Sequence, residues 1–363
     1  MDRHADRMRR AAAEGATQGF DAVVVAPSPD LAYLAAYDPM PLERPTLLIL
    51  RPGRTPVVLV PELERPLAAA SAGGAHAELV GWVDGVDPYA EAARLLPASG
   101  RVAVGDRIWG AHLLALQAAL PGVTFSPASS VLGRLRAIKD DDELGALRRA
   151  AAGADAAFGD VCALAFVGRR ETEVAADLAR LLVEHGHDRA DFTIVASGPN
   201  AASPHHEPGE RTIERGDAVV LDFGGALDGY FSDTTRTVVV GEPPEGFEPV
   251  YALVRAAQAA AVETVRPGVA IQEVDRAARR VIAEAGYGDR FVHRTGHGIG
   301  LEVHEPPYAV EGDTTVLEPG MTFSVEPGVY LEGRFGVRIE DIVAVTADGV
   351  ERLNTTTRDL QVV

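Results

Sequence analysis

Residues 218–240 read AVVLDFGGALDGYFSDTTRTVVV, with two β-patterned runs on either side of GGALDG. Two such runs around a short glycine-containing segment are typical of a β-hairpin. A turn around Leu227 and Asp228 predicts that Asp222 and Asp233 oppose each other across the two strands. Opposed residues of an antiparallel pair hold their Cβ atoms about 4.5–5.5 Å apart, and like charges there are destabilising. Either these two charges destabilise the hairpin, or the chain binds a cation between them.

A second hairpin repeats this arrangement in MTFSVEPGVYLEGRFGVRIEDIVAV, residues 321–345. A turn centred on Gly333 predicts that Glu326 opposes Glu340. Asp222 and Glu340 both have apolar neighbours in the sequence, where an unpaired carboxylate is costly. Four inward carboxylates form a hard-oxygen site whose charge balances two divalent ions.

A glycine-rich stretch, FVHRTGHGIGLEVHEPPY at residues 291–308, supplies imidazoles. Glycines on both sides of His297 allow the backbone to approach closely and expose the ring, so we predict His297 as a fifth ligand. A histidine ligand favours manganese, cobalt, iron or zinc over magnesium or calcium. His304 and His205 are not needed for the metals and are free for substrate binding and proton transfer.

The region up to about residue 128 alternates helical and strand patterns, which predicts an α/β domain. Its strands are expected at 21–26, 46–50, 55–60 and 101–106. Acidic residues 140–142 precede a long helical pattern, where Asp can cap a helix and complement its dipole. We therefore place a domain boundary near residue 130.

The remaining chain repeats one pattern, in which helices are followed by sheet. Helices are expected at 171–187, 247–266 and 270–286, and β-rich stretches at 191–241 and from 291 to the end. Two successive rounds of helices and sheet predict a duplicated α+β half.

Length and charge limit the classes of partner. The 363 residues favour two domains, with one large domain as the alternative. With 53 acidic and 34 basic residues the net charge is −19, which serves solubility or reflects carboxylates gathered around a cation. No Lys/Arg cluster is dense enough to follow a phosphate backbone, so nucleic acid and anionic membranes are poor candidates as partners, and we expect neither. Without a long apolar run or a signal-peptide pattern, we expect a soluble cytoplasmic protein.

The motifs VLDFGG, FSDTTRT, GHGIGLEVHE, SVEPGVY and GVRIED occur in this order. Together they resemble the creatinase/methionine-aminopeptidase-like metallopeptidases of family M24, which have the pita-bread fold, and within them the Xaa-Pro dipeptidases (prolidases) and aminopeptidases P. The resemblance extends from about residue 140 onwards, and the preceding region fits the creatinase-type amino-terminal domain. It implies an α/β N-terminal domain at 1–130 and an α+β pita-bread catalytic domain at 131–363.

The resemblance also implies roles for individual residues. Two divalent ions, with manganese expected and cobalt, zinc or iron as alternatives, would activate a bridging water or hydroxide that attacks the scissile carbonyl. Asp233 and Glu340 would be shared by both ions, and Glu326 would also transfer a proton to the leaving prolyl nitrogen. The implied metal ligands are Asp222, Asp233, His297, Glu326 and Glu340.

Three further residues are implied around the ligands. His205, which follows the dipeptide SP as the family's loop histidine does, and His304 would bind substrate and stabilise the oxyanion, whereas His206 is expected to be a solvated neighbour. Arg338 would share a strand face with Glu340 and orient that carboxylate.

The implied reaction is hydrolysis of the bond between an N-terminal residue and proline, in a short proline-containing peptide. Aminopeptidase P activity on longer peptides, a creatinase-like C–N hydrolase, a lyase and an inactive binding module remain as alternatives. The segment EPPYAVEGDTTVLEPGMTFSV has no arginine to bind a dipeptide carboxylate, as certain prolidases have there. A homodimer is expected, mainly by analogy with the family.

Overall fold

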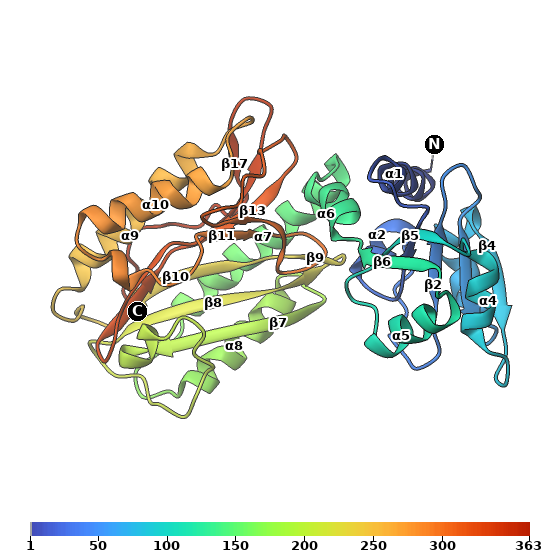
Figure 1. The fold of residues 1–363 in the computed structure, drawn as a ribbon. Coiled ribbons are helices and arrows are strands. Elements are labelled where there is room, and N and C mark those ends of the chain that lie inside the picture. The colour runs from blue at the N-terminus through green and yellow to red at the C-terminus, as the bar shows by residue number, and fades with distance from the viewer. Residues whose placement is uncertain (1) are drawn as a thin grey trace. The chain divides into compact units, whose positions relative to one another are not determined.

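The computed structural model describes residues 2–363, which divide into one compact unit ending at Arg136 and a second at Ala137–Val363. The boundary expected near residue 130 falls inside helix α6 (Ser129–Ala137). This helix is bonded to the N-terminal unit, since Gln18 Nε2 donates to Ser130 O at 2.8 Å and Tyr33 Oη donates to Leu135 O at 3.1 Å. Figure 1 shows each unit as a mixed α/β body.

The N-terminal unit is built on a six-stranded sheet with the order β4-β3-β2-β1-β5-β6. Its strands are β1 (Ala22–Val25), β2 (Leu47–Leu50), β3 (Val57–Pro61), β4 (Glu78–Trp82), β5 (Gly100–Val104) and β6 (Val123–Pro127). Its other helices are α1 (Arg3–Thr17), α2 (Pro29–Ala35), α3 (Arg65–Ala70), α4 (Pro88–Leu95), α5 (Gly110–Ala119) and the short 3₁₀ turn η1 (Gly74–His76). The four predicted strands are confirmed as β1, β2, β3 and β5. The unpredicted β4 and β6 are the edge strands, which are largely exposed and therefore lack a buried apolar run.

The C-terminal unit repeats a helix pair followed by strands. The first half contains α7 (Asp141–Cys162), α8 (Glu171–Glu184), β7 (Arg189–Ser197), η2 (Gly198–Ala202), β8 (Ala218–Leu227), β9 (Tyr230–Phe231) and β10 (Thr234–Val239). The second half contains α9 (Phe247–Thr264), α10 (Gln272–Glu284), η3 (Gly288–Arg290), β11 (Gly296–Gly298), β12 (Glu305–Ala309), β13 (Thr322–Val325), β14 (Gly328–Leu331), β15 (Phe335–Arg338), β16 (Asp341–Val345) and β17 (Val350–Arg352). Figure 1 shows the pairs α7–α8 and α9–α10 on opposite sides of the strands, which agrees with the predicted duplication.

The start of α7 agrees with the sequence-based interpretation of the acidic cluster. Asp140 is the N-cap residue and forms a reciprocal capping box with Glu143, which satisfies two amide groups at the helix start.

The first acidic hairpin has a different register from the predicted one. β8 and β10 pair Asp222 with Thr235 rather than with Asp233, so the predicted opposition is wrong by two residues. The turn lies at Asp228 and Gly229, whose φ angles of 52° and 79° are those of a tight hairpin turn with an Asp-Gly sequence. Because strand side chains alternate with a period of two, Asp222 and Asp233 still lie on the same face.

The second acidic hairpin has the predicted register. β13 and β16 pair Val325 with Asp341, and β14 and β15 continue in the same register, so Glu326 opposes Glu340 between the two ladders. The turn is centred on Gly333, which has a φ angle of 72°.

Asp341 anchors the end of the chain against the core. It is fully buried and accepts bonds from Arg236 Nη2 at 2.8 Å, Arg352 Nη1 at 2.9 Å and Arg358 Nε at 2.5 Å. Gln258 Nε2 adds a fourth bond at 2.8 Å. Burial raises the pKa of Asp341, but the guanidinium groups of Arg236 and Arg358 lower it below its usual value.

We expect Asp341→Asn to destabilise the protein by about 3–5 kcal/mol, because it removes the carboxylate that balances buried guanidinium groups. Urea denaturation measures this loss. Asp228→Asn is the matched control, since Asp228 forms an exposed pair with Arg149 at 2.9 Å. It should change the free energy of unfolding by less than about 1 kcal/mol. Equal effects of the two substitutions would contradict the anchoring role.

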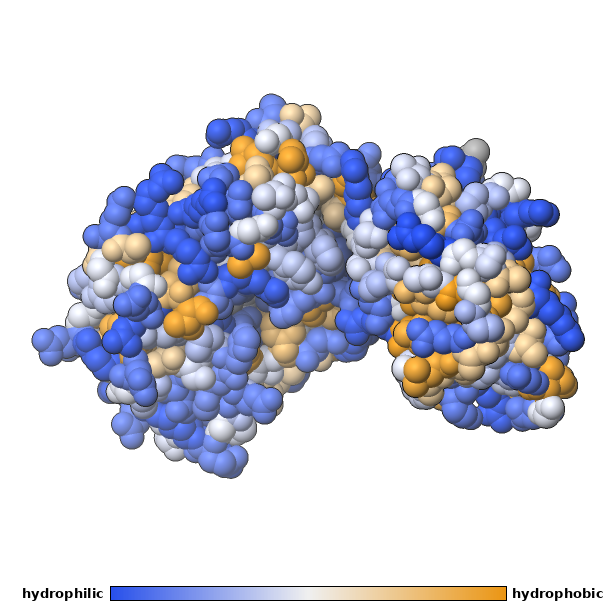
Figure 2. Space-filling view, in the orientation of Figure 1, coloured by the Kyte–Doolittle hydropathy of each residue, from blue (hydrophilic) through white to orange (hydrophobic). Residues whose placement is uncertain are grey.

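The surface carries apolar side chains among polar ones, as the face drawn in Figure 2 shows for both units. In the N-terminal unit Met40, Leu63 and Leu67 are exposed by 74%, 66% and 66%. Within residues 2–363, none of the helices has the length and apolar character needed to cross a bilayer.

Candidate metal centre

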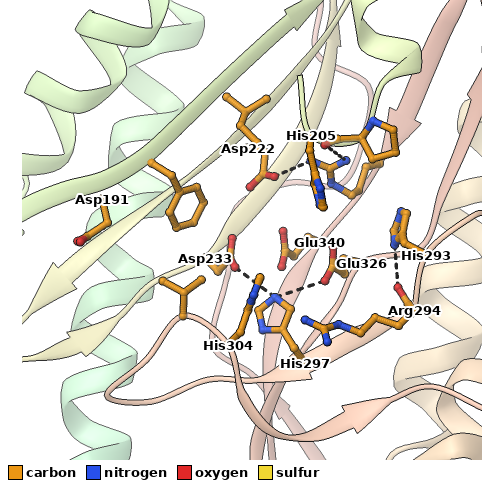
Figure 3. A pocket seen from close by; sticks show the side chains of 15 residues that line it. Asp191, His205, Asp222, Asp233, His293, Arg294, His297, His304, Glu326 and Glu340 are labelled. Carbon is orange, nitrogen blue, oxygen red and sulfur yellow. Dashed lines mark hydrogen bonds and ion pairs between the residues drawn. The ribbon is translucent and has the colours of Figure 1, made fainter. Parts of the chain in front are cut away.

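The predicted site residues meet in one cavity of the C-terminal unit, with a volume of about 610 Å³ (Figure 3). All eight of them line it: Asp222, Asp233, His297, Glu326, Glu340, His205, His304 and Arg338. These residues come from both acidic hairpins, from the glycine-rich stretch and from the loop after η2, so the fold brings together segments that are far apart in the sequence.

Three of the five predicted ligands form the tightest cluster. One ligand atom each from Asp233, His297 and Glu340 lies within 4.8 Å of the others, and all three residues are buried. His297 Nε2 lies 3.5 Å from Asp233 Oδ2 and 3.4 Å from Glu326 Oε1. Figure 3 shows Asp222 directed into the same cavity from β8.

The two glutamates reach the cavity because their backbones leave their own hairpin. The amide of Glu326 donates to Thr295 O at 2.8 Å, and the amide of Glu340 donates to Thr235 O at 3.0 Å. Each acid is thereby bonded to a neighbouring segment that also carries a predicted ligand, since Thr295 lies two residues before His297 and Thr235 two residues after Asp233.

The hydrogen-bond pattern fits a bound cation. His297 Nδ1 lies 3.2 Å from Gly298 O, and a carbonyl only accepts, so the proton belongs on Nδ1. Nε2 then presents a lone pair to the carboxylate oxygens of Asp233 and Glu326. Lone pairs that face each other at this distance repel unless a cation lies between them.

Two buried oxygens also indicate a bound cation. Among residues 2–363, Asp222 Oδ1 and Glu340 Oε1 are buried without a hydrogen-bond partner. A buried polar atom without a partner is costly, and a divalent cation would satisfy both. Burial and neighbouring carboxylates raise the pKa of Asp233 and Glu340 well above their usual values, and burial raises the pKa of Glu326 to about 7. The set of four carboxylates and one imidazole suits manganese, cobalt, iron or zinc.

The two further predicted histidines border this cluster. The His304 ring lies 4.0 Å from the His297 ring between centroids, at an angle of 61°. Burial, followed by the neighbouring His297, lowers the pKa of His304 to about 4, which makes it neutral at pH 7. Figure 3 shows His205 approaching from the opposite side, next to Asp222.

The comparison with family models covers almost the whole chain. Residues 145–347 match the model of metallopeptidase family M24, and residues 7–138 match that of the creatinase/prolidase N-terminal domain. The chain belongs to metallopeptidase family M24. The fold is therefore the pita-bread fold preceded by a creatinase-type domain, and the protein is a divalent-metal-dependent peptidase.

Individual relatives are similar in sequence to this chain over nearly their full lengths. A probable dipeptidase PepE of Mycobacterium tuberculosis is 45% identical over 99% of this chain and 96% of its own length. An Xaa-Pro dipeptidase of Lactobacillus delbrueckii subsp. lactis is 36% identical over 95% of both chains. The crystal structure of dipeptidase PepE from Mycobacterium ulcerans has a TM-score of 0.96 at 43% identity, covering 99% of this chain and 98% of that one.

Arg338 of this M24 chain contacts a different carboxylate from the predicted one. Its Nη2 donates to Asp222 Oδ2 at 2.5 Å, and its Nη1 donates to Tyr330 Oη at 2.9 Å. Glu340 instead accepts a bond from Thr235 Oγ1 at 2.6 Å. Arg338 Nε donates to the same Thr235 Oγ1 at 3.2 Å, so the arginine reaches Glu340 only through the threonine hydroxyl. Sequence spacing did not indicate Thr235 or Tyr330.

The loop that carries His205 is held by a buried acid that the sequence analysis missed. Glu171, at the start of α8, accepts bonds from Ser197 N at 2.7 Å, Asn200 Nδ2 at 3.0 Å and Gly209 N at 3.1 Å. His206 Nε2 lies 2.9 Å from the same carboxylate, so His206 anchors the loop rather than being a solvated neighbour. An acid in the first turn of a helix is common, so nothing local in the sequence distinguished Glu171.

We expect Glu171→Gln to destabilise the protein more at neutral pH than at acidic pH. Burial raises the pKa of Glu171, but hydrogen bonds from Ser197, His206 and Asn200 lower it below its ordinary 4.5. A carboxyl with a lowered folded-state pKa contributes stability above its unfolded pKa and loses it as the pH falls through the folded value. The difference in unfolding free energy between wild type and variant should therefore shrink below pH 4.5. Urea denaturation between about pH 6 and pH 3 checks this, and a difference independent of pH would contradict it.

Proposed function

We propose that this M24 peptidase hydrolyses the bond between an N-terminal residue and proline in dipeptides, with two divalent cations bound by Asp222, Asp233, His297, Glu326 and Glu340. The observation that carries the proposal is the buried cluster of carboxylates and one imidazole, in which two oxygens lack any partner among residues 2–363. The Lactobacillus relative is an Xaa-Pro dipeptidase, which supports the choice of bond. We propose manganese as the metal.

The bound cations would supply a water of lowered pKa as nucleophile and would polarise the scissile carbonyl. Glu326 is proposed to take up a proton and return it to the prolyl nitrogen, because a secondary amine must be protonated to leave. His205 and His304 are proposed to donate hydrogen bonds to the carbonyl oxygen as its negative charge develops. Arg338 is proposed to keep the carboxylate of Asp222 in its orientation.

The cavity also supports a small substrate. Its volume of about 610 Å³ lies within the range of about 300–1,000 Å³ that small-molecule sites occupy. Arg294 lines it with a guanidinium group 4.5 Å from the centre of the Tyr308 ring. Although the segment that follows His304 has no arginine, Arg294 offers a positive charge for the carboxylate of a dipeptide, and we propose it as that anchor.

The experiment is cleavage of Ala-Pro and Ala-Pro-Ala, measured side by side before and after chelator-stripped protein receives manganese. We expect no cleavage by the stripped protein and restored cleavage of Ala-Pro. Preference for the tripeptide would assign the chain to the aminopeptidase P type, and a lack of cleavage of both peptides, with metal bound, would overturn the substrate class.

We also propose a homodimer, which exposed apolar side chains of the N-terminal unit such as Met40, Leu63 and Leu67 support. Light scattering of the purified protein tests this, and a monomer at high concentration would exclude it.

A further inference from the structure

Lys139 is the one lysine in the sequence, and its side chain is buried. Its Nζ lies 2.8 Å from Glu305 Oε1, and the side chains of the two residues are exposed by only 1% and 2%. Nζ also donates to Ala137 O at 3.4 Å. A fully desolvated ion pair contributes little to stability compared with a well-packed apolar pair, so its presence calls for another explanation.

The pair packs against the segment that carries the cavity histidines. A Cβ atom on Gly300 would lie 2.6 Å from Glu305 Oε1 and 3.0 Å from Lys139 Cε, so both side chains press against the backbone of residue 300. Residue 300 belongs to the loop 299–304 between β11 and β12, and the ladder at the base of this loop pairs Gly298 with Glu305. The ion pair therefore contacts the loop at residue 300 and holds Glu305, the residue that directly follows the loop.

The direction of the side chains connects the pair to the candidate site. His304 directly precedes Glu305 in the chain, so the position of one residue constrains that of the other. Glu305 points into the interior towards Lys139, and the preceding His304 points into the cavity beside His297, as Figure 3 shows. We propose that the Lys139–Glu305 ion pair is a positioning device that fixes the His304 imidazole at the metal centre. The proposal deepens the function proposed above and rests on it for the role of His304.

The geometry also explains a lysine in a chain whose other basic residues are arginines. An ammonium group is compact, whereas a guanidinium group is larger and planar. Because Lys139 Cε and Glu305 Oε1 already lie against Gly300, we expect the larger group to displace the loop. Lys139→Arg should therefore lower kcat although it conserves the charge, and an unchanged kcat in this variant would overturn the proposal.

A double-mutant cycle tests whether the pair acts through His304. Glu305→Gln is made in the wild type and in His304→Ala, and kcat and KM for Ala-Pro are measured with manganese. We expect about a 10- to 100-fold loss of kcat in the wild-type background, as for other groups that orient a functional residue. In the His304→Ala background we expect no further loss, because the group being positioned is absent. Equal losses in both backgrounds would indicate a general structural role and overturn the proposal.

A second measurement does not depend on activity. Because Lys139 is the one lysine, acylation by an N-hydroxysuccinimide ester followed by peptide mass spectrometry reports on this site directly. We expect slow acylation in the native protein and faster acylation in Glu305→Gln and Gly300→Ala. Gly159→Ala is the matched control, because nothing lies within 4 Å of a Cβ atom there.

The two measurements separate the two proposals. If the wild type with bound metal does not cleave Ala-Pro, the proposed function fails, and the acylation rates still decide whether the pair holds the loop. Acylation of native Lys139 as fast as that of an unfolded chain, or no change in either variant, would overturn the positioning role. Unchanged manganese content in Glu305→Gln is expected, since the pair positions His304 rather than a proposed metal ligand.

Discussion

Asp233→Asn should lose bound metal and peptide cleavage together. Asp233 is buried beside Glu340 and lies 3.5 Å from His297 Nε2, at the centre of the tightest group of candidate ligand atoms. Asparagine removes one negative charge and replaces one ligand oxygen by an NH₂ group that cannot bind a cation. We expect turnover of Ala-Pro to fall by more than about 100-fold, which is the loss that removal of an outer-shell partner alone can cause.

Metal content by mass spectrometry and kcat for Ala-Pro are the two quantities to compare. Asp228→Asn, in the turn of the same hairpin, is the control, because Asp228 lies on the surface and should leave both quantities unchanged. An Asp233→Asn protein that keeps full metal-dependent turnover would contradict the assignment of Asp233 as a metal ligand.

His304→Ala should retain metal and fold but lose rate. The ring faces the cavity next to His297 and is not part of the tightest cluster around Asp233. Removal of one hydrogen-bond donor to a developing oxyanion typically costs about 10²–10³ in kcat, and we expect a loss of this size with little change in KM. Steady-state kinetics, metal content and thermal unfolding together measure the outcome.

His185→Ala is the matched control for this substitution. His185 is paired with Asp160 at 2.8 Å and does not line the cavity, so its removal should leave kcat unchanged. If His304→Ala unfolds the protein or releases the metal, the residue serves structure rather than substrate.

The two hairpins show how accurately a local sequence pattern predicts strand register. For Glu326 and Glu340 the predicted opposition is confirmed, because the turn is symmetric about Gly333. For Asp222 and Asp233 it is wrong by two residues, because the Asp-Gly turn lies one residue further along the chain than expected. The error leaves the face of each carboxylate unchanged, since a strand repeats every two residues.

Such patterns did not predict which groups the charged side chains contact. Arg338 was expected to orient Glu340, two residues away; it reaches Glu340 only through Thr235 and donates directly to Asp222, 116 residues away. Lys139 pairs with Glu305 across 166 residues, and Glu171 binds Gly209 of the His205 loop across 38 residues. Spacing along one element does not specify which distant segment packs against it.

The family, the fold and the face on which each cavity carboxylate lies could all be predicted from the order of residues in the chain. These depend on motif order and on strand alternation, and both are properties of neighbouring residues. Three features needed the folded chain: which oxygens remain without a hydrogen-bond partner, which carboxylate Arg338 contacts directly, and the position of Lys139 against the loop of His304. These depend on where the two halves of the C-terminal unit pack, because a long charged side chain bonds whatever group the packing brings within its reach.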